Sequence, residues 1–117
     1  MAFVPTADLD RAHAFYGGVL GLERVESSSF AHVYDAGGTA LRVTRVESPT
    51  GAAHTVLGWR VENLEQTMSE LRERGVKFLF YQRMEQDENA VWTSPSGSRI
   101  AWFSDPDGNT LSLQQPA

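Results

Sequence analysis

The sequence has no cysteine, only three histidines and no apolar run long enough to cross a bilayer. The missing cysteine excludes disulfides and thiolate chemistry, so His, Asp and Glu are the only strong metal ligands left. Residues 1–5 lead directly into a strand pattern, without the basic stretch, apolar run and cleavage site of a secretory leader. We therefore expect a protein that is neither secreted nor membrane-spanning and that is located in the cytoplasm.

Basic residues are also scarce. Lys and Arg number 10 against 15 Asp and Glu, which gives a formal net charge of −5. Nucleic-acid binding needs a basic surface, so we expect no nucleic-acid partner. The 117 residues, 41% of them hydrophobic, are enough for one domain, residues 1–117, with its own core.

The clearest local pattern is a hairpin at the end of the chain. Asp105, Pro106 and Gly108 fit a type I turn, in which proline presets φ and glycine supplies the left-handed residue. Strands 99–104 and 110–114 flank the turn. Because side chains alternate along a strand, Leu111 and Leu113 share one face, and the polar residues between them share the other. The sheet is thus predicted to have one apolar face, covered by other elements, and one polar face that lines a binding site.

The remaining chain divides into two halves that repeat one pattern. Each half has a strand and then a helix that begins at a polar cap, Asp8 or Asn63, 55 positions apart, and is ended by glycine. Between the halves, residues 47–53 have no apolar period and are interpreted as a linker. The elements expected are strand Ala2–Ala7, a helix to about Leu20, strands Leu22–Glu26, Phe30–Asp35, Ala40–Val46 and Val56–Glu62, helix Leu64–Arg74 and strand Val76–Gln82.

The polar segment 83–98 has two interpretations. It is either a pocket lid that carries an exposed Trp92, or it contains a short strand, residues 91–93, whose tryptophan packs in the core.

Two motifs point to a known family. The segment 8–12 (DLDRA), followed by Phe15-Tyr16 and Leu20-Gly21-Leu22, and the hairpin 102–109 (WFSDPDGN) resemble the vicinal oxygen chelate superfamily of glyoxalases, bleomycin-resistance proteins and extradiol dioxygenases. The resemblance implies an α+β fold in which two tandem βαβββ modules, 1–46 and 54–117, form a curved, cup-shaped mixed sheet with helices on its convex side. Many members dimerise, so a homodimer is expected.

The same resemblance locates four positions at which enzymes of the family hold a divalent metal. Here they fall on Met1, Arg42, Val56 and Ser112. None supplies the His, Asp or Glu side chain that such an ion requires, and Arg42 would repel it. We therefore expect neither a metal nor another cofactor.

Alternation along the strands extends the cup face from these positions to their neighbours. Arg42 is either the partner of an anionic group on a ligand or a member of an internal ion pair. His32 and Tyr34 share one strand face, which could also line the cup; Trp102 could face either way, His13 is expected in solvent and Trp59 in the core. The predicted ligand-binding residues are Phe3, Pro5, His32, Tyr34, Arg42, Thr44, Val56, Arg60, Trp92, Trp102, Ser112 and Gln114.

Three functions follow. The leading one is metal-free sequestration of a small organic molecule in the cup, as in the drug-binding members of the family. The first alternative is a metal-dependent lyase, isomerase or dioxygenase whose ligands lie elsewhere, with His54 as one ligand if the strand register slips. The second is a metal-free enzyme with His32 or Tyr34 as acid or base.

Overall fold

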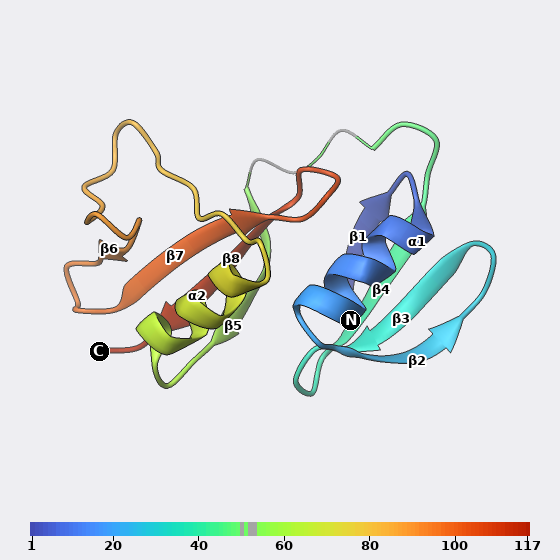
Figure 1. Ribbon diagram of the computed structural model, residues 1–117, viewed down its shortest axis with the longest axis horizontal. Coiled ribbons are helices and arrows are strands. Elements are labelled where there is room, and N and C mark those ends of the chain that lie inside the picture. Colours follow the sequence, from blue (N-terminus) through green and yellow to red (C-terminus); the bar gives the residue numbers. More distant parts are fainter. Residues whose placement is uncertain (50, 52–53) are drawn as a thin grey trace.

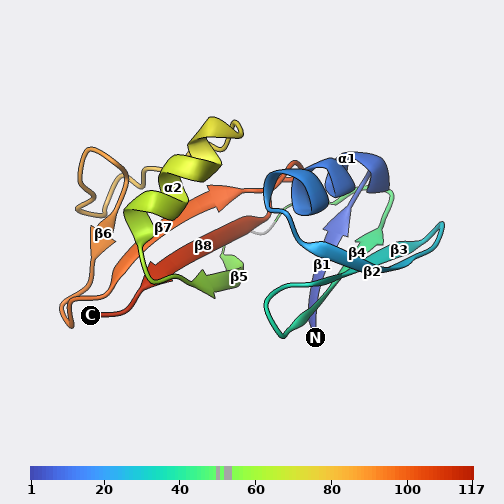
Figure 2. The same cartoon turned by 60° about the horizontal axis from the view of Figure 1, so that its bottom comes forward.

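The computed structural model describes residues 1–49, 51 and 54–117, and it contains two mixed four-stranded sheets with helices on one side (Figures 1 and 2). Module 1 contains β1 (Ala2–Thr6), α1 (Leu9–His13), η1 (Ala14–Val19), β2 (Glu23–Ser27), β3 (Ala31–Asp35) and β4 (Ala40–Arg45). Module 2 contains β5 (Thr55–Arg60), α2 (Leu64–Glu73), β6 (Trp92–Thr93), β7 (Arg99–Ser104) and β8 (Thr110–Gln115).

The two modules share one topology, as predicted. Their strand orders are β1-β4-β3-β2 and β5-β8-β7-β6. In each, the first strand runs parallel to the last, and the other pairs are antiparallel. The edge strands β1 and β5 lie next to each other, so β2 and β6 form the outer edges of the molecule (Figure 1). This is the α+β fold that the repeat predicted.

Both predicted helix caps are confirmed. Asp8 Oδ1 accepts hydrogen bonds from the backbone N–H of Asp10 and Arg11 at 3.0 and 3.1 Å. Asn63 Oδ1 accepts from the N–H of Gln66 at 3.1 Å. Each cap thus satisfies N–H groups that have no partner within the helix.

The first helix extends to the predicted region but changes its winding. After His13 it continues as the π-helical segment η1, and Gly21, with φ of +71°, follows its end. The His13 ring fills the space above Gly17, where a Cβ would lie 2.6 Å from His13 Cε1. The wider turn and the glycine together make room for this ring.

One continuous core lies between the helices and the sheets of both modules. Leu111 and Leu113 face it, as the alternation predicted, together with the fully buried Tyr16, Leu41 and Phe103. Trp59 also packs against this core, as expected. The opposite face of each sheet, turned away from the helices, is called the cup face below.

The predicted strand Val76–Gln82 is wrong, because this segment makes only one bridge, from Phe78 to Phe103. The N–H of Leu79 donates to the carbonyl of Trp102 at 2.8 Å, and a side chain satisfies further backbone groups of the segment. Gln86 accepts a hydrogen bond from the N–H of Tyr81 at 2.7 Å and donates to the carbonyls of Leu79 and Ala90 at 2.8 and 2.9 Å. The edge of the sheet is formed by β6, so the short strand expected within residues 91–93 is confirmed, whereas the expected packing of Trp92 in the core is not.

In the predicted linker, Thr50, Ala52 and Ala53 lie outside the described residues. Gly51 has φ of +71° and touches the final turn, since a Cβ there would come within 3.0 Å of the carbonyl oxygens of Asp107 and Gly108. Only a glycine fits so close to another backbone segment.

The final turn also joins module 2 to module 1. We call the group Thr6, Arg11, Tyr16, Asp105, Asp107 and Asn109 the clasp. Tyr16 Oη donates to Asp105 Oδ2 at 2.6 Å, and Asp107 accepts from Thr6 Oγ1 at 2.5 Å and from Arg11 Nη2 at 2.8 Å. Asp105 also accepts two hydrogen bonds from Asn109. The backbone N–H of Asn109 donates to Oδ1 at 2.8 Å and its side-chain amide donates to Oδ2 at 2.9 Å, and these bonds hold the turn in shape.

Candidate functional site

Strand register places four predicted site residues of module 1 on the cup face. Phe3 pairs with Arg42 and Pro5 with Thr44, and paired residues share a face. Their neighbours Val4 and Val43 are buried in the core on the other side. The positions agree with the prediction, whereas their role in binding stays a prediction.

Arg42 lies in a hollow of about 420 Å³ that is lined by Glu26, Ser27, Ser28, Ala31 and Val33. It is half-buried, and it makes no hydrogen bond or ion pair with any residue in the described part of the chain. The two described ion pairs are Arg11–Asp107 and Arg99–Glu65, so the alternative of an internal ion pair for Arg42 finds no support among residues 1–49, 51 and 54–117. Its guanidinium is available to an acceptor from outside the chain.

The cup face of module 2 is aromatic. Trp102 pairs with Ser112. Trp92 pairs with Ile100, which in turn pairs with Gln114, so these side chains share one face of the sheet. The rings of Trp92 and Trp102 have centroids 6.3 Å apart, and Tyr81 meets Trp102 edge-on at 5.6 Å. Trp92 therefore packs on the cup face and not in the core.

Hydrogen bonding fixes this aromatic surface. Trp102 Nε1 donates to Thr55 Oγ1 at 3.2 Å. Arg60 lies on the same face, opposite Gln114, and Ser112 fills the space beside Gly58, where any Cβ would collide with Ser112 Oγ. The prediction for Val56 needs correction: it is the extra residue of a bulge between Thr55 and Leu57, and it packs against the core.

The predicted placement of His32 and Tyr34 on the cup is wrong. His32 pairs with Val43 and Tyr34 with Leu41, and both partners face the core. Tyr34 Oη lies 2.9 Å from Nδ1 of His13 and 3.3 Å from Nδ1 of His32. The three side chains thus form a polar cluster at α1. His13, which was expected in solvent, is half-buried in this cluster.

Burial shifts the pKa of His32 and that of Tyr34. It lowers the pKa of His32, with further lowering by Arg24 and His13, and it raises the pKa of Tyr34. Neither group faces the cup, so the interpretation as acid or base for a ligand bound there is overturned.

Two cup-side residues were missed. Tyr81 was assigned to a strand that does not form, and Glu26 follows a bulge in β2 that shifts its register. A tyrosine followed by a mostly polar stretch, 83–89, is the only sequence signal for Tyr81. No local pattern indicates the bulge.

The chain does not fit the metal of the family enzymes. Met1 is exposed, and Arg42, Val56 and Ser112 carry no suitable donor. Among the described residues there is no group of three or more His, Cys, Asp and Glu side chains that could hold an ion, and His54 is exposed just before β5.

The structure thus consists of two βαβββ modules joined edge to edge, with a polar and aromatic cup face. Residues 1–113 match the profile of the Glyoxalase/Bleomycin resistance protein/Dioxygenase superfamily. The chain belongs to this superfamily. None of the curated proteins matches it significantly.

Solved structures share the fold at low sequence identity. The bleomycin resistance determinant encoded on transposon Tn5 is 21% identical, with 98% of this chain and 94% of that chain covered and a TM-score of 0.75. Lactoylglutathione lyase from Agrobacterium tumefaciens is 18% identical, with 97% and 89% covered and a TM-score of 0.75. A bleomycin-binding protein solved with bleomycin is 21% identical, with 98% and 95% covered and a TM-score of 0.74. Binding proteins and enzymes thus share this architecture. In the described part of the chain, no helix is long and apolar enough to cross a membrane.

Proposed function

We propose that this protein binds and sequesters a small organic molecule on the cup face without a metal, and that the ligand carries an aromatic ring and an acidic or strongly accepting group. The observation that carries the proposal is Arg42, a half-buried residue that lines a hollow and has no hydrogen-bond or ion-pair partner in the described chain. A charge withdrawn from water is costly unless it is paired, so an acceptor on the ligand would stabilise it. The bleomycin-binding structure of the same fold supports a binding role.

The aromatic part of the ligand has a matching surface in module 2. Trp92, Trp102 and Tyr81 present a half-buried group of rings, and stacking on such rings favours flat molecules. Arg60, Ser112 and Gln114 add polar groups on the same face.

The cup of one chain is open, and we propose that a homodimer completes it. The Arg42 hollow extends to the outer strand β2, whereas Trp92 lies on the outer strand β6. The two parts of the cup face therefore lie at opposite ends of a molecule that is 43 Å long. Phe3 and Phe30 of module 1 are 64% and 67% exposed. Sedimentation analysis should show a dimer, and Phe3→Ser should weaken it; a monomer at all concentrations would refute this part.

Arg42→Met tests the ligand's charge. The probe is 8-anilinonaphthalene-1-sulfonate, an aromatic anion whose fluorescence rises in apolar sites. Loss of a charge-assisted contact of about 2 kcal/mol should weaken its binding roughly 30-fold, while the midpoint of thermal unfolding stays the same or rises.

Arg45→Met is the matched control, because Arg45 is exposed on the same strand and faces the other side. It should leave binding unchanged. Equal loss in both variants would mean non-specific attraction. Unfolding of Arg42→Met would assign Arg42 a structural role and refute the acidic-ligand proposal.

The metal-dependent alternative is tested by elemental analysis of the purified protein. We expect less than about one tenth of a divalent ion per chain, because the matching positions lack several hard ligands. Stoichiometric Zn, Ni, Mn or Fe would overturn the metal-free proposal. The absence of a nucleic-acid partner and the cytoplasmic location remain predictions.

A further inference from the structure

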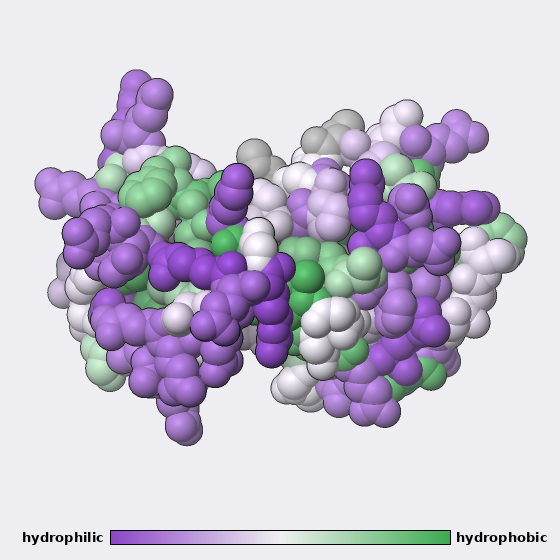
Figure 3. Space-filling view, in the orientation of Figure 1, coloured by the Kyte–Doolittle hydropathy of each residue, from purple (hydrophilic) through white to green (hydrophobic). Residues whose placement is uncertain are grey.

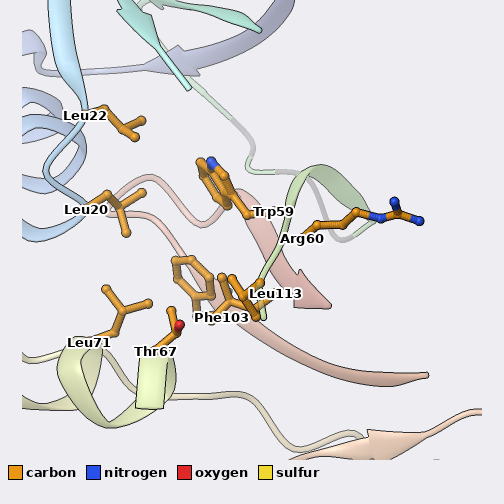
Figure 4. Close-up of a pocket in the computed structure, with 9 residues that line it drawn as sticks. Leu20, Leu22, Trp59, Arg60, Thr67, Leu71, Phe103 and Leu113 are labelled. Carbon is orange, nitrogen blue, oxygen red and sulfur yellow. The ribbon is translucent and has the colours of Figure 1, made fainter. Parts of the chain in front are cut away.

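A second hollow lies on the helix side of the sheets, where the modules meet. Leu20 and Leu22 of module 1 form one wall (Figure 4). Trp59, Leu71, Phe103 and Leu113 of module 2 form the others. The hollow has a volume of about 220 Å³ and is separated from the cup face by the sheet of module 2, because Phe103 and Leu113 point toward the core.

The walls offer almost no polar recognition. The Arg60 side chain borders the hollow but points away from the other lining residues (Figure 4). Thr67 Oγ1 is already engaged, since it donates to the carbonyl of Asn63 at 3.1 Å. Among the described residues, no carboxylate lines the hollow. A charged ligand would lose its hydration there without compensation, so the walls favour an uncharged one.

The hollow is a gap in an otherwise continuous core. Leu20, Leu22 and Trp59 pack against buried core residues but remain half-exposed at its edge. From the helix side, hydrophobic surface gathers at the junction of the two modules, with hydrophilic residues around it (Figure 3). Filling the gap would remove this apolar surface from water and restore packing contacts. An apolar cavity of about 150 Å³ suffices for benzene, so this volume suits a bicyclic ring.

We propose that this hollow is a second binding site, for a small uncharged aromatic molecule about the size of a bicyclic ring. Its occupant touches side chains of both modules and holds them together. The site does not depend on the proposed function of the cup, because it lies on the other face of the sheet and contains none of the cup residues except the rim position Arg60.

The test uses indole as the probe and methyl resonances of leucine-labelled protein as the readout. Indole should shift the methyl signals of Leu20, Leu22, Leu71 and Leu113 saturably and leave that of Leu41 unchanged, since Leu41 lies in the core of module 1, outside the hollow. Thr67→Leu places a larger side chain in the hollow and should weaken binding at least tenfold. Ser69→Leu, an exposed position on the same helix, is the matched control and should bind as the unmodified protein does.

Further variants distinguish indole binding in this hollow from binding on the cup face and from a loss of folding. Arg42→Met should leave indole binding unchanged, so failure of the cup proposal would not affect this one. Circular dichroism checks the fold of Thr67→Leu, and Leu20→Phe is a second variant that fills the hollow. The proposal is overturned if indole causes no saturable shifts, or if both filling variants fold and bind normally. It is also overturned if the same methyl signals shift on dilution without indole, because a second copy would then cover the hollow.

Discussion

Removal of one hydroxyl from the clasp should measure how strongly the modules are held together. Tyr16 is fully buried and donates to the nearly buried carboxylate of Asp105 at 2.6 Å. Hydrogen bonds to charged groups contribute about 1.5 to 3 kcal/mol, and Tyr16→Phe leaves that carboxylate oxygen with only the side-chain amide of Asn109. We expect a loss of about 2 kcal/mol in the free energy of unfolding.

This loss is large enough to measure. Globular proteins unfold with an entropy of about 2.1 cal/mol/K per residue, so for 117 residues the midpoint of thermal unfolding should fall by roughly 8 °C. Urea unfolding at pH 7 provides the free energy directly. Tyr81→Phe is the control: its hydroxyl has no hydrogen-bond partner in the described chain, and its removal should change stability by less than about 0.5 kcal/mol.

High pH provides a second readout. Burial and the neighbouring Asp105 raise the pKa of Tyr16 well above 10.0. Above pH 10 the unfolded chain therefore loses a proton that the folded chain keeps, so the stability present at lower pH decreases as pH rises. One proton corresponds to about 1.4 kcal/mol per pH unit, and Tyr16→Phe should reduce the slope by up to that amount. A change below about 0.5 kcal/mol at pH 7, together with an unchanged slope, would refute the clasp as a stabilising contact.

Two further predictions concern the turn and the polar cluster. Gly108 has φ of +83°, so Gly108→Ala should cost roughly 1 to 2 kcal/mol in urea unfolding. Gly18→Ala is the control and should not destabilise the fold, because φ is not positive there and the new Cβ would meet no described atom within 4 Å beyond the backbone of its own helix. Equal effects of the two changes would contradict the turn assignment. Burial, Arg24 and His13 lower the pKa of His32, so the unfolded state gains a proton below pH 6.5 that the folded state excludes. Stability should thus decrease from pH 7 to pH 5, less so in His32→Gln, and equal pH profiles of both proteins would contradict this.

Features coded by neighbouring residues could be predicted from the sequence. The caps at Asp8 and Asn63 and the turn at Gly108 depend on side chains within a few positions of the backbone they serve, and all three are confirmed. The same holds for the apolar face of β8, since alternation fixes which residues share a face.

The predictions failed where the local structure depends on pairing with a distant strand or on the hydrogen bonds of a side chain. Alternation placed His32 and Tyr34 together but did not say on which face, and only pairing with β4 shows that they face the core. The segment after α2 has a strand-like pattern, yet the Gln86 side chain takes two of its backbone hydrogen bonds. The bulge at Val56 likewise depends on β8.

The clasp also has a consequence for the order of folding. Its partners are 89 to 104 positions apart in the chain, whereas β3 and β4 pair residues that are 5 to 13 positions apart. Closing so long a loop has a high entropic cost, so we expect each module to form before the clasp closes. Contacts made after the transition state act on the unfolding rate. In stopped-flow experiments, Tyr16→Phe should therefore speed unfolding and leave the folding rate nearly unchanged, which makes the final turn the determinant of how long the two modules stay together.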